Sequence, residues 1–365
     1  MTNLAHIYRG KKILLTGHTG FKGAWLAEWL YYLGAEVTGF SLPPQTSPSL
    51  FDTLGLAQRL KHKFGNICDL ALLRETVSEC RPDFVFHLAA QSLVRLSYSE
   101  PVNTYATNVM GTVHVLEAVR LAQRPCVIVA VTTDKCYENR EWLHGYREED
   151  RLGGYDPYSS SKAAAELAVS AYRRSFFPAE SGMRLASVRA GNVLGGGDWA
   201  EDRIVPDCIR ALQQNNVIRV RNPHSTRPWQ HVLDPLSGYL QLGAQMYEAG
   251  SDFSRARKLC DAFNFGPSVT SNRSVSDLVE EVLKSWPGKW DITPDAQGPH
   301  EGGLLNLSSD KAFHLLNWQS TWNFQQTVAR TVNWYRKVHD GMDPRQVMRD
   351  DIEAHTDDRQ AAIAS

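Results

Sequence analysis

The feature that most constrains the fold is a glycine-rich turn that directly follows the first short apolar run of the chain. Gly17, Gly20 and Gly23 form a G-x-x-G-x-x-G pattern after residues 12–15, and a helical pattern over residues 20–33 continues from it. Glycines permit a tight turn, so the backbone amides and the positive end of the helix can face a pyrophosphate. An ordinary strand-to-helix turn is the alternative for such a pattern in isolation.

Apolar runs alternate with amphipathic helical patterns through the first half of this 365-residue chain. The runs predicted to be strands are residues 12–15, 36–40, 84–88, 126–132 and 184–189. The predicted helices are residues 20–33, 71–80, 102–122 and 157–176. This alternation predicts an α/β fold with a Rossmann-like, doubly wound parallel sheet that binds nucleotides at the carboxyl ends of its strands. In that context the glycine turn is a phosphate-binding loop.

Beyond about Asn192 the alternation gives way to loops rich in Gly, Pro and Trp, at residues 195–199, 222–229 and 286–303. We therefore predict a dinucleotide-binding domain over residues 1–191 that also carries the catalytic residues. Residues 192–345 should form a smaller, loop-rich substrate-binding lobe with some return to the first domain. The polar and acidic residues from about 343 onward predict a loosely packed helix and a tail, residues 346–365, without a chemical role.

Charge and cysteine content exclude several classes of partner. The chain has 39 basic and 40 acidic residues, so it lacks the basic footprint of a protein that binds nucleic acid or an anionic membrane surface. No apolar run approaches the roughly 20 residues of a membrane span, and the first ten residues lack a signal-peptide layout. The six cysteines lack the short spacing of zinc or redox sites. We expect buried free thiols, a cytoplasmic protein and no metal.

A dinucleotide held by the glycine turn would contact Thr19, Phe21 and Lys22 in the turn and Ser41 after the second predicted strand. No acidic residue follows that strand, where a Rossmann site usually holds the adenosine ribose, and no Arg or Lys follows to bind a 2′-phosphate. NAD is therefore favoured over NADP, although Lys22 could partly replace the 2′-phosphate clamp.

Two further segments complete the predicted cofactor site. Asp69 could accept a hydrogen bond from the adenine amine, or it could only cap the helix that follows it. The run Leu88, Ala89 and Ala90 supplies small residues where the cofactor backbone must pass, and Gln91 follows as a candidate substrate contact.

Tyr158 and Lys162 are the candidate reacting pair. Four residues apart, they lie on one face of a predicted helix, so the ammonium can lower the pKa of the phenol and bind the nicotinamide ribose. A phenolate beside a hydroxyl is a base for hydride transfer. A solvated helix face is the alternative for this spacing alone, but the glycine turn and the strand over residues 126–132 favour the chemical interpretation.

Taken together, the glycine turn, Thr133 after the strand over residues 126–132, Asn108 and the Y-x-x-x-K pattern resemble the extended short-chain dehydrogenases that act on nucleotide sugars. The resemblance extends to about residue 340. It implies that Thr133 hydrogen-bonds the sugar 4-hydroxyl, Tyr158 takes the proton of that hydroxyl and Lys162 supports Tyr158. It also implies that Asn108 holds the local geometry.

Asp134 and Lys135 distinguish branches of this family. The 4,6-dehydratases resemble one another in a Thr-Asp-Glu run, whereas here Lys135 replaces the Glu. That exchange, within TTDKCYEN over residues 132–139, is similar to the CDP-glucose 4,6-dehydratase branch, as are TGHTGFKG over residues 16–23 and RAGNV over residues 189–193. The resemblance implies that Asp134 helps to expel the C6 hydroxyl. Lys135 could remove the C5 proton or stabilise an enolate, and a local ion pair of the two is the alternative.

The predicted nucleotide-sugar contacts lie mainly in the second half of the chain. Asn192 corresponds to a diphosphate contact in the resembling family, and Arg227 is the strongest candidate for a diphosphate clamp because a guanidinium can bind phosphate through two hydrogen bonds. Weaker candidates are Arg203, Arg219, His300 and Glu301. His231 is more typical of a structural residue.

The resemblance implies one catalytic cycle: oxidation at C4 by NAD, loss of water across C5 and C6, and return of the hydride to C6. Its product would be CDP-4-keto-6-deoxy-glucose, a precursor for deoxysugars of bacterial surface polysaccharides such as O-antigen. The alternatives are a nucleotide-sugar 4-epimerase or decarboxylase, a dehydratase of another nucleotide hexose, and a non-catalytic dinucleotide-sensing protein.

Relatives pair the helices that carry Asn108 and Tyr158 across a two-fold axis. Apolar positions on these helices, including Val113, Leu116, Leu167 and Ala171, predict a homodimer or a dimer of dimers. A core within a single chain would explain the same pattern.

Overall fold

One parallel sheet forms the centre of the molecule and confirms the predicted fold class. The computed structural model describes residues 3–293 and 304–364, and within them the sheet has seven strands in the order β11-β6-β5-β4-β1-β2-β3. All neighbouring strands run parallel. The strands are β1 (Lys12–Thr16), β2 (Glu36–Ser41), β3 (Lys61–Phe64), β4 (Phe84–His87), β5 (Cys126–Val131), β6 (Met183–Arg189) and β11 (Ala262–Asn264). The strand order reverses between β1 and β4, where such sheets bind nucleotides.

The five predicted strands end within one residue of their predicted bounds, whereas β3 and β11 were not predicted. The sequence of β3 is KHKF, and none of its residues is fully buried, so it lacks the apolar pattern that indicates a strand. The strand β11 has only three residues. Both lie at the edges of the sheet, where tertiary pairing rather than local sequence decides the structure.

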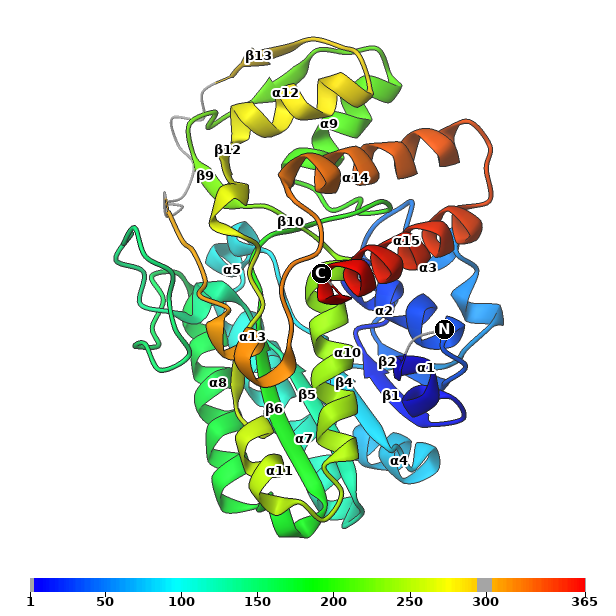
Figure 1. The fold of residues 1–365 in the computed structure, drawn as a ribbon, viewed down its shortest axis with the longest axis vertical. Helices are drawn as coiled ribbons and strands as arrows, with labels where there is room; N and C mark the ends of the chain where they lie inside the picture. The colour runs from blue at the N-terminus through cyan, green and yellow to red at the C-terminus, as the bar shows by residue number, and fades with distance from the viewer. Residues whose placement is uncertain (1–2, 294–303, 365) are drawn as a thin grey trace.

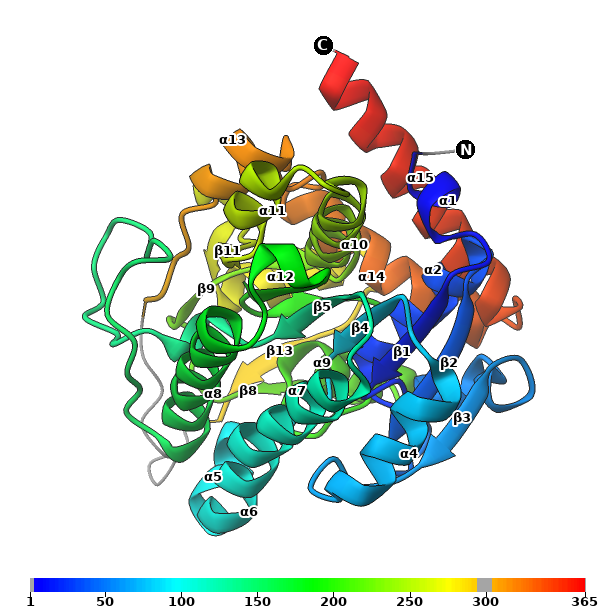
Figure 2. The same ribbon diagram turned by 90° about the horizontal axis from the view of Figure 1, so that it is seen from below.

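Helices cover both faces of the sheet (Figure 2). Those on one face are α4 (Leu70–Cys80), α7 (Gly111–Ala122) and α8 (Pro157–Ser175), and those on the other include α2 (Phe21–Tyr32) and α10 (Leu233–Glu248). Alternate strand residues serve the two cores: Leu14 and Val85 pack with the first group, whereas Ile13 and Phe86 pack with the second. Strands that are buried on both faces consist of continuous apolar runs, so these strands could be predicted from the sequence.

The predicted helix over residues 102–122 is not continuous. It is divided into α6 (Pro101–Tyr105), a π-helical turn η2 (Ala106–Met110) and α7. Such wide turns commonly occur at functional sites. Here the turn carries Asn108, whose buried amide holds other site residues, as described below.

The C-terminal lobe lies at one end of the molecule (Figure 1). Its main elements are α9 (Ile204–Gln213), β8 (Ile218–Val220), α12 (Val275–Ser285), β13 (Trp290–Ile292) and α14 (Phe324–His339). Short strand pairs join β7 (Val193–Leu194) to β10 (Gln230–His231) and β9 (Thr226–Pro228) to β12 (Asn272–Ser274). Two long helices, α10 and α14, each of 16 residues, also lie beyond Asn192, where the sequence indicated mainly loops.

The remaining short elements connect these layers. They are α1 (Asn3–Tyr8), α3 (Leu50–Thr53), α5 (Val94–Ser99), α11 (Phe253–Leu259), α13 (Asp310–Leu316), η1 (Leu56–Gln58), η3 (Asp134–Cys136), η4 (Ala179–Ser181) and η5 (Val269–Ser271). None of the helices in the described ranges combines the length and apolar character of a membrane-spanning segment. All six cysteines are free, and three of them are buried.

The last helix, α15 (Pro344–Ala364), is not the loosely packed segment that its composition predicted. Val347, Met348 and Ile352 are buried in the main core. His355 is also buried, and its Nε2 lies 3.0 Å from Asp234 Oδ1 on α10. A narrow apolar stripe is sufficient to pack the helix against the core. That stripe is difficult to recognise in the sequence because most residues of the helix are polar.

Candidate active site

The glycine turn lies at the carboxyl end of β1 and packs directly against the loop after β4. Gly17 has φ of 79°, and a Cβ there would lie 2.7 Å from the backbone nitrogen of Ala89. A Cβ on Gly23 would lie 2.0 Å from the carbonyl oxygen of Gly17. Gly20 precedes α2 without any side-chain cap, so the first amides of the helix remain available to an anion. This turn fits the pyrophosphate of a dinucleotide.

Around the predicted adenosine end, Thr19 and Ser41 form a buried pair. Their hydroxyl oxygens are 2.8 Å apart, and Thr19 also donates to the carbonyl oxygen of Leu42 at 2.9 Å. Asp69 caps α4 by accepting a hydrogen bond from the Leu72 amide at 3.0 Å. The capping role of Asp69 is therefore confirmed, whereas its contact with adenine stays a prediction.

Lys22 lies with the reacting groups. Its Nζ is 5.8 Å from the centroid of the Tyr239 ring. Burial lowers the pKa of Lys22 to about 8, the charges of Arg203 and Lys162 add to this decrease, and Asp134 opposes it. This position removes the basis for a 2′-phosphate clamp by Lys22, because the side chain reaches toward the reaction centre.

Tyr158 and Lys162 both lie on the buried face of α8. The helix begins with Pro157 and is capped by Asp156, which accepts from the Ser159 amide at 2.9 Å. Tyr158 is only 8% exposed and Lys162 only 6%. The solvated-face alternative is therefore wrong.

Burial has opposite effects on the two groups. It raises the pKa of Tyr158 to about 12, and a hydrogen bond with Thr133 opposes the increase. It lowers the pKa of Lys162 to about 8, and the charge of Glu166 opposes that decrease. The Lys162 ammonium also donates to the carbonyl oxygen of Val131 at 3.4 Å. Thr133, Tyr158 and Lys162 thus meet at the carboxyl end of β5, as the sequence predicted. The predicted lowering of the Tyr158 pKa is wrong, because burial outweighs the groups that oppose the increase.

Thr133, Asp134 and Lys135 form a tight turn at this strand end. Thr133 Oγ1 donates to Asp134 Oδ1 at 3.0 Å and accepts from the Lys135 amide at 3.3 Å. Burial raises the pKa of Asp134, although the charge of Lys135 and the bond from Thr133 oppose this. A carboxyl group that retains its proton more readily than usual is suited to act as a general acid.

A cavity of about 690 Å³ opens beside this turn. Four predicted residues contribute to its wall: Asp134, Lys135, Asn192 and Arg227. The sequence analysis did not predict the other lining residues, which include Val94, Tyr137, Glu138, Asn139, Arg140, Tyr155, Ser159 and Leu305. Arg227 donates to the Thr226 carbonyl oxygen at 2.8 Å, and its charge acts on Asp134. The cavity therefore joins the acidic turn to the candidate diphosphate clamp.

Asn108 and Gln91 have structural contacts. The Asn108 amide accepts from the Gln91 backbone at 2.9 Å and donates to Ser161 Oγ, also at 2.9 Å. The side chain of Gln91 donates to Thr104 at 2.9 Å and accepts from the Leu93 amide at 2.6 Å. Asn108 thus holds the local geometry, while the Gln91 side chain is engaged by its own loop.

The other predicted residues differ in their positions. Arg203 pairs with Asp198 at 2.8 Å, and its charge acts on Tyr158. Arg219 is exposed and pairs with Asp291 across β8 and β13 at 3.1 Å, so the structure does not bring it to the reaction centre. His231 is buried against Trp322, with ring centroids 4.7 Å apart, which confirms its structural role. His300 and Glu301 lie outside the described residues.

Two other features bear on the predicted site. In the described part of the chain, no group of three or more His, Cys, Asp or Glu side chains is arranged to hold a metal ion. Glu166 was not predicted, although it follows Lys162 by one helical turn and is buried on the same helix. The same four-residue spacing that identified Lys162 could have identified it.

Comparison with known proteins gives consistent results. A sequence profile described as GDP-mannose 4,6 dehydratase matches residues 14–331. A protein of Salmonella typhimurium described as CDP-glucose 4,6-dehydratase is 46% identical over 336 residues, which cover 91% of this chain and 92% of that protein.

Solved structures with low sequence identity share the fold. The dTDP-glucose 4,6-dehydratase DesIV of Streptomyces venezuelae, with NAD and TYD bound, superposes with a TM-score of 0.76 at 23% identity, covering 91% of this chain and 99% of that one. The UDP-glucose 4-epimerase of Thermotoga maritima gives 0.74 at 20% identity, with 90% and 99% covered.

Proposed function

Because this chain belongs to the GDP-mannose 4,6 dehydratase family, we propose that it converts CDP-D-glucose to CDP-4-keto-6-deoxy-D-glucose with NAD as cofactor. The main support for the proposal is that Thr133 and Tyr158 lie beside the acid Asp134, which lines the cavity. The nucleotide follows from the relative at 46% identity, which is described as acting on CDP-glucose.

Tyr158 carries the oxidation step. The hydroxyl of Thr133 lies close enough to Tyr158 to lower its pKa, so a sugar 4-hydroxyl bound beside both groups can donate its proton to Tyr158. The buried ammonium of Lys162 stabilises the phenolate that this transfer requires. A bound NAD would supply the acceptor for the C4 hydride and its donor to C6, while C5 regains a proton.

Asp134 and Lys135 carry the elimination. The 4-keto group makes the C5 hydrogen acidic, so Lys135, at the cavity wall, can remove that proton or stabilise the resulting enolate. Asp134 gives its proton to the departing C6 hydroxyl, which leaves as water. Arg227 and Asn192 line the same cavity and hold the diphosphate.

Two alternatives remain open to experiment. A 4-epimerase would share Thr133, Tyr158 and Lys162 but would have no use for an acid and a base beside Thr133. A non-catalytic dinucleotide-sensing protein would need none of these reacting groups together.

Mass analysis of nucleotide sugars incubated with the protein and NAD tests the proposal. We expect CDP-glucose to lose one water, and UDP-, GDP- and dTDP-glucose to remain unchanged. Loss of water from a different sugar would change the proposed substrate and keep the reaction. Isomerisation without a change in mass would favour the epimerase, and unchanged sugars throughout would contradict an enzymatic role.

A second copy of the chain is the proposed partner. The exposed side chains of Val102, Met110 and Leu167 are 82%, 48% and 62% accessible and lie on α6, η2 and α8, which contact one another. A two-fold axis would bury this apolar surface against itself. Leu116, in contrast, belongs to the core of a single chain. Light scattering should give twice the chain mass for the wild type and the chain mass for Leu167→Glu; an unchanged mass in the variant would exclude this surface.

The cytoplasm is the proposed compartment, because six free thiols are typical of a reducing environment. The proposed product fits the supply of deoxysugars for surface polysaccharides. Cell fractionation tests the compartment, and detection of the protein in the extracellular fraction would contradict it.

A further inference from the structure

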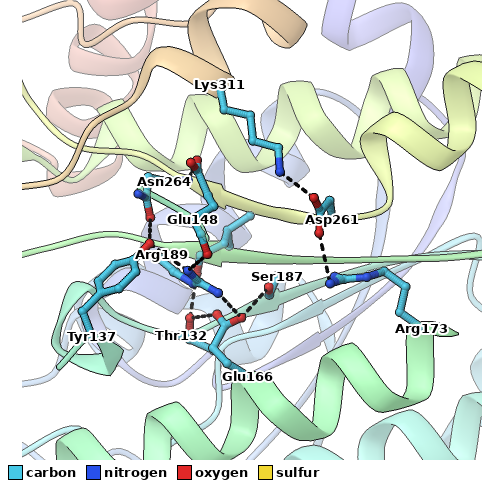
Figure 3. A network of polar contacts seen from close by, with 11 residues as sticks. Thr132, Tyr137, Glu148, Glu166, Arg173, Ser187, Arg189, Asp261, Asn264 and Lys311 are labelled. Atoms are coloured by element: carbon cyan, nitrogen blue, oxygen red, sulfur yellow. Dashed lines mark hydrogen bonds and ion pairs between the residues drawn. The ribbon is translucent and has the colours of Figure 1, made fainter. Parts of the chain in front are cut away.

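Glu166 lies in a network of polar contacts with Thr132, Ser187 and Arg189 (Figure 3). It is 3% exposed on α8 and follows Tyr158 and Lys162 on the same helical face. The proposed cycle gives it no role, and neither Thr132 nor Arg189, its partners, contacts the reacting atoms in that cycle.

Both oxygens of Glu166 accept hydrogen bonds from the carboxyl ends of two strands. Oε1 accepts from Thr132 Oγ1 at 2.5 Å. Oε2 accepts from Ser187 Oγ at 2.8 Å and from Arg189 Nη2 at 2.9 Å. The helix that carries the base is thereby tied to the strand end that carries Thr133.

We propose that Glu166 is a positioning residue of the oxidation step: its bonds to Thr132 and Arg189 fix the strand end that carries Thr133 against α8. This inference rests on the proposed function, because it assigns the chemistry of Tyr158 and Lys162 to C4 oxidation.

Arg189 extends the same contacts to the wall of the cavity. Its Nη1 donates to Tyr137 Oη at 2.7 Å, and Tyr137 donates to Asn264 Oδ1 at 2.7 Å. Tyr137 lines the cavity, and Asn264 lies on β11. The ion pair of Glu166 and Arg189 therefore joins the reacting helix to the substrate wall.

Charge and burial give the ion pair a second effect. Burial alone would raise the pKa of Glu166, but Arg189 and the hydroxyls of Thr132 and Ser187 hold it below its ordinary value. The carboxylate is therefore ionised at neutral pH, and its charge raises the pKa of Lys162 against the effect of burial. The other titratable groups that act on or respond to Lys162 are Cys136 on η3, Lys22 on α2 and His87 on β4.

The pH dependence of catalysis distinguishes this role from simple structural support. Activity that needs protonated Lys162 is present at low pH and is lost as the pH rises through the pKa of Lys162, about 8. In Glu166→Gln that pKa falls further, so we expect the alkaline limb of kcat/KM to move down by about one pH unit. Slower oxidation should also increase the kinetic isotope effect measured with C4-deuterated substrate.

Three variants serve as controls. Arg173→Met removes an ion pair with Asp261 near the end of the same helix and should leave both the pH limb and the isotope effect unchanged. Glu166→Asp retains the charge and should retain the wild-type limb, with a lower kcat from poorer positioning. If Glu166→Gln does not fold, Glu166→Gln with Arg189→Met removes both buried charges and should show the same shifted limb.

The inference would be overturned if folded Glu166→Gln, or the double variant, had the same alkaline limb and the same isotope effect as the wild type. NMR titration of the protein with isotope-labelled lysine gives the same comparison without substrate, because the shift of the Lys162 signal reports its protonation directly. If the wild type does not dehydrate CDP-glucose, the proposed function fails, and the NMR titrations alone then decide whether Glu166 keeps Lys162 protonated.

Discussion

Replacement of Tyr158 by phenylalanine should reduce turnover by roughly 10²–10⁴-fold, the usual contribution of a positioned proton-transfer group. The ring would still fill its buried place on α8, so the fold and the binding of NAD and nucleotide sugar should change little. Only the oxygen beside Thr133 is lost. Rapid kinetics should therefore show no reduced cofactor, and mass analysis should show no loss of water.

Tyr172 on the same helix offers a matched control for Tyr158→Phe. Its hydroxyl donates to Glu117 at 3.2 Å. Because neither residue belongs to the turn of Thr133, Asp134 and Lys135, Tyr172→Phe should retain wild-type turnover. Appearance of reduced cofactor in Tyr158→Phe at the wild-type rate would mean that another group removes the C4-hydroxyl proton.

Asp134→Asn should separate the two halves of the reaction. The amide keeps the size of the side chain but cannot give up a proton as a carboxylic acid does, so elimination should slow by roughly 10²–10⁴-fold while oxidation at C4 continues. Reduced cofactor should accumulate, which absorbance detects, and the product with one water fewer should disappear.

The pH dependence of elimination provides a second measurement on Asp134. Burial raises the pKa of Asp134, and the acid acts only in its protonated form. In the wild type the elimination rate should therefore fall as the pH rises through that raised pKa. The slow elimination that remains in Asp134→Asn should not show this fall. Equal loss of oxidation and elimination, with no reduced cofactor, would contradict the assigned role.

Local patterns predicted the sheet and the reacting pair because each signal lies within a few residues. The glycine turn shows in the sequence because Gly17 needs a positive φ and Gly23 has no room for a Cβ. Tyr158 and Lys162 can be recognised as a pair in the sequence because one helical turn separates them. The cavity wall formed by Tyr137 and Leu305 could not be predicted, since it depends on segments that are distant in the chain.

Features that depend on distant segments could not be predicted either. The charge of Arg219 makes it a candidate for binding substrate, but its ion-pair partner Asp291 comes from a strand that local sequence does not reveal. The break in the predicted helix at Asn108 requires contacts with Gln91 and Ser161 that stabilise the wider turn. The docking of α15 depends on Asp234, 121 residues before His355.

The packing of α15 also determines when the first half of the protein can mature. Glu28 on α2 is fully buried and pairs with Arg59 at 2.6 Å, and its Oε1 lies 3.4 Å from Arg349, 321 positions later in the sequence. During synthesis on the ribosome, the helix that follows the glycine turn emerges long before Arg349, its partner on α15. The nucleotide-binding half can therefore begin to assemble early, but its outer surface is completed only after α15 has been synthesised.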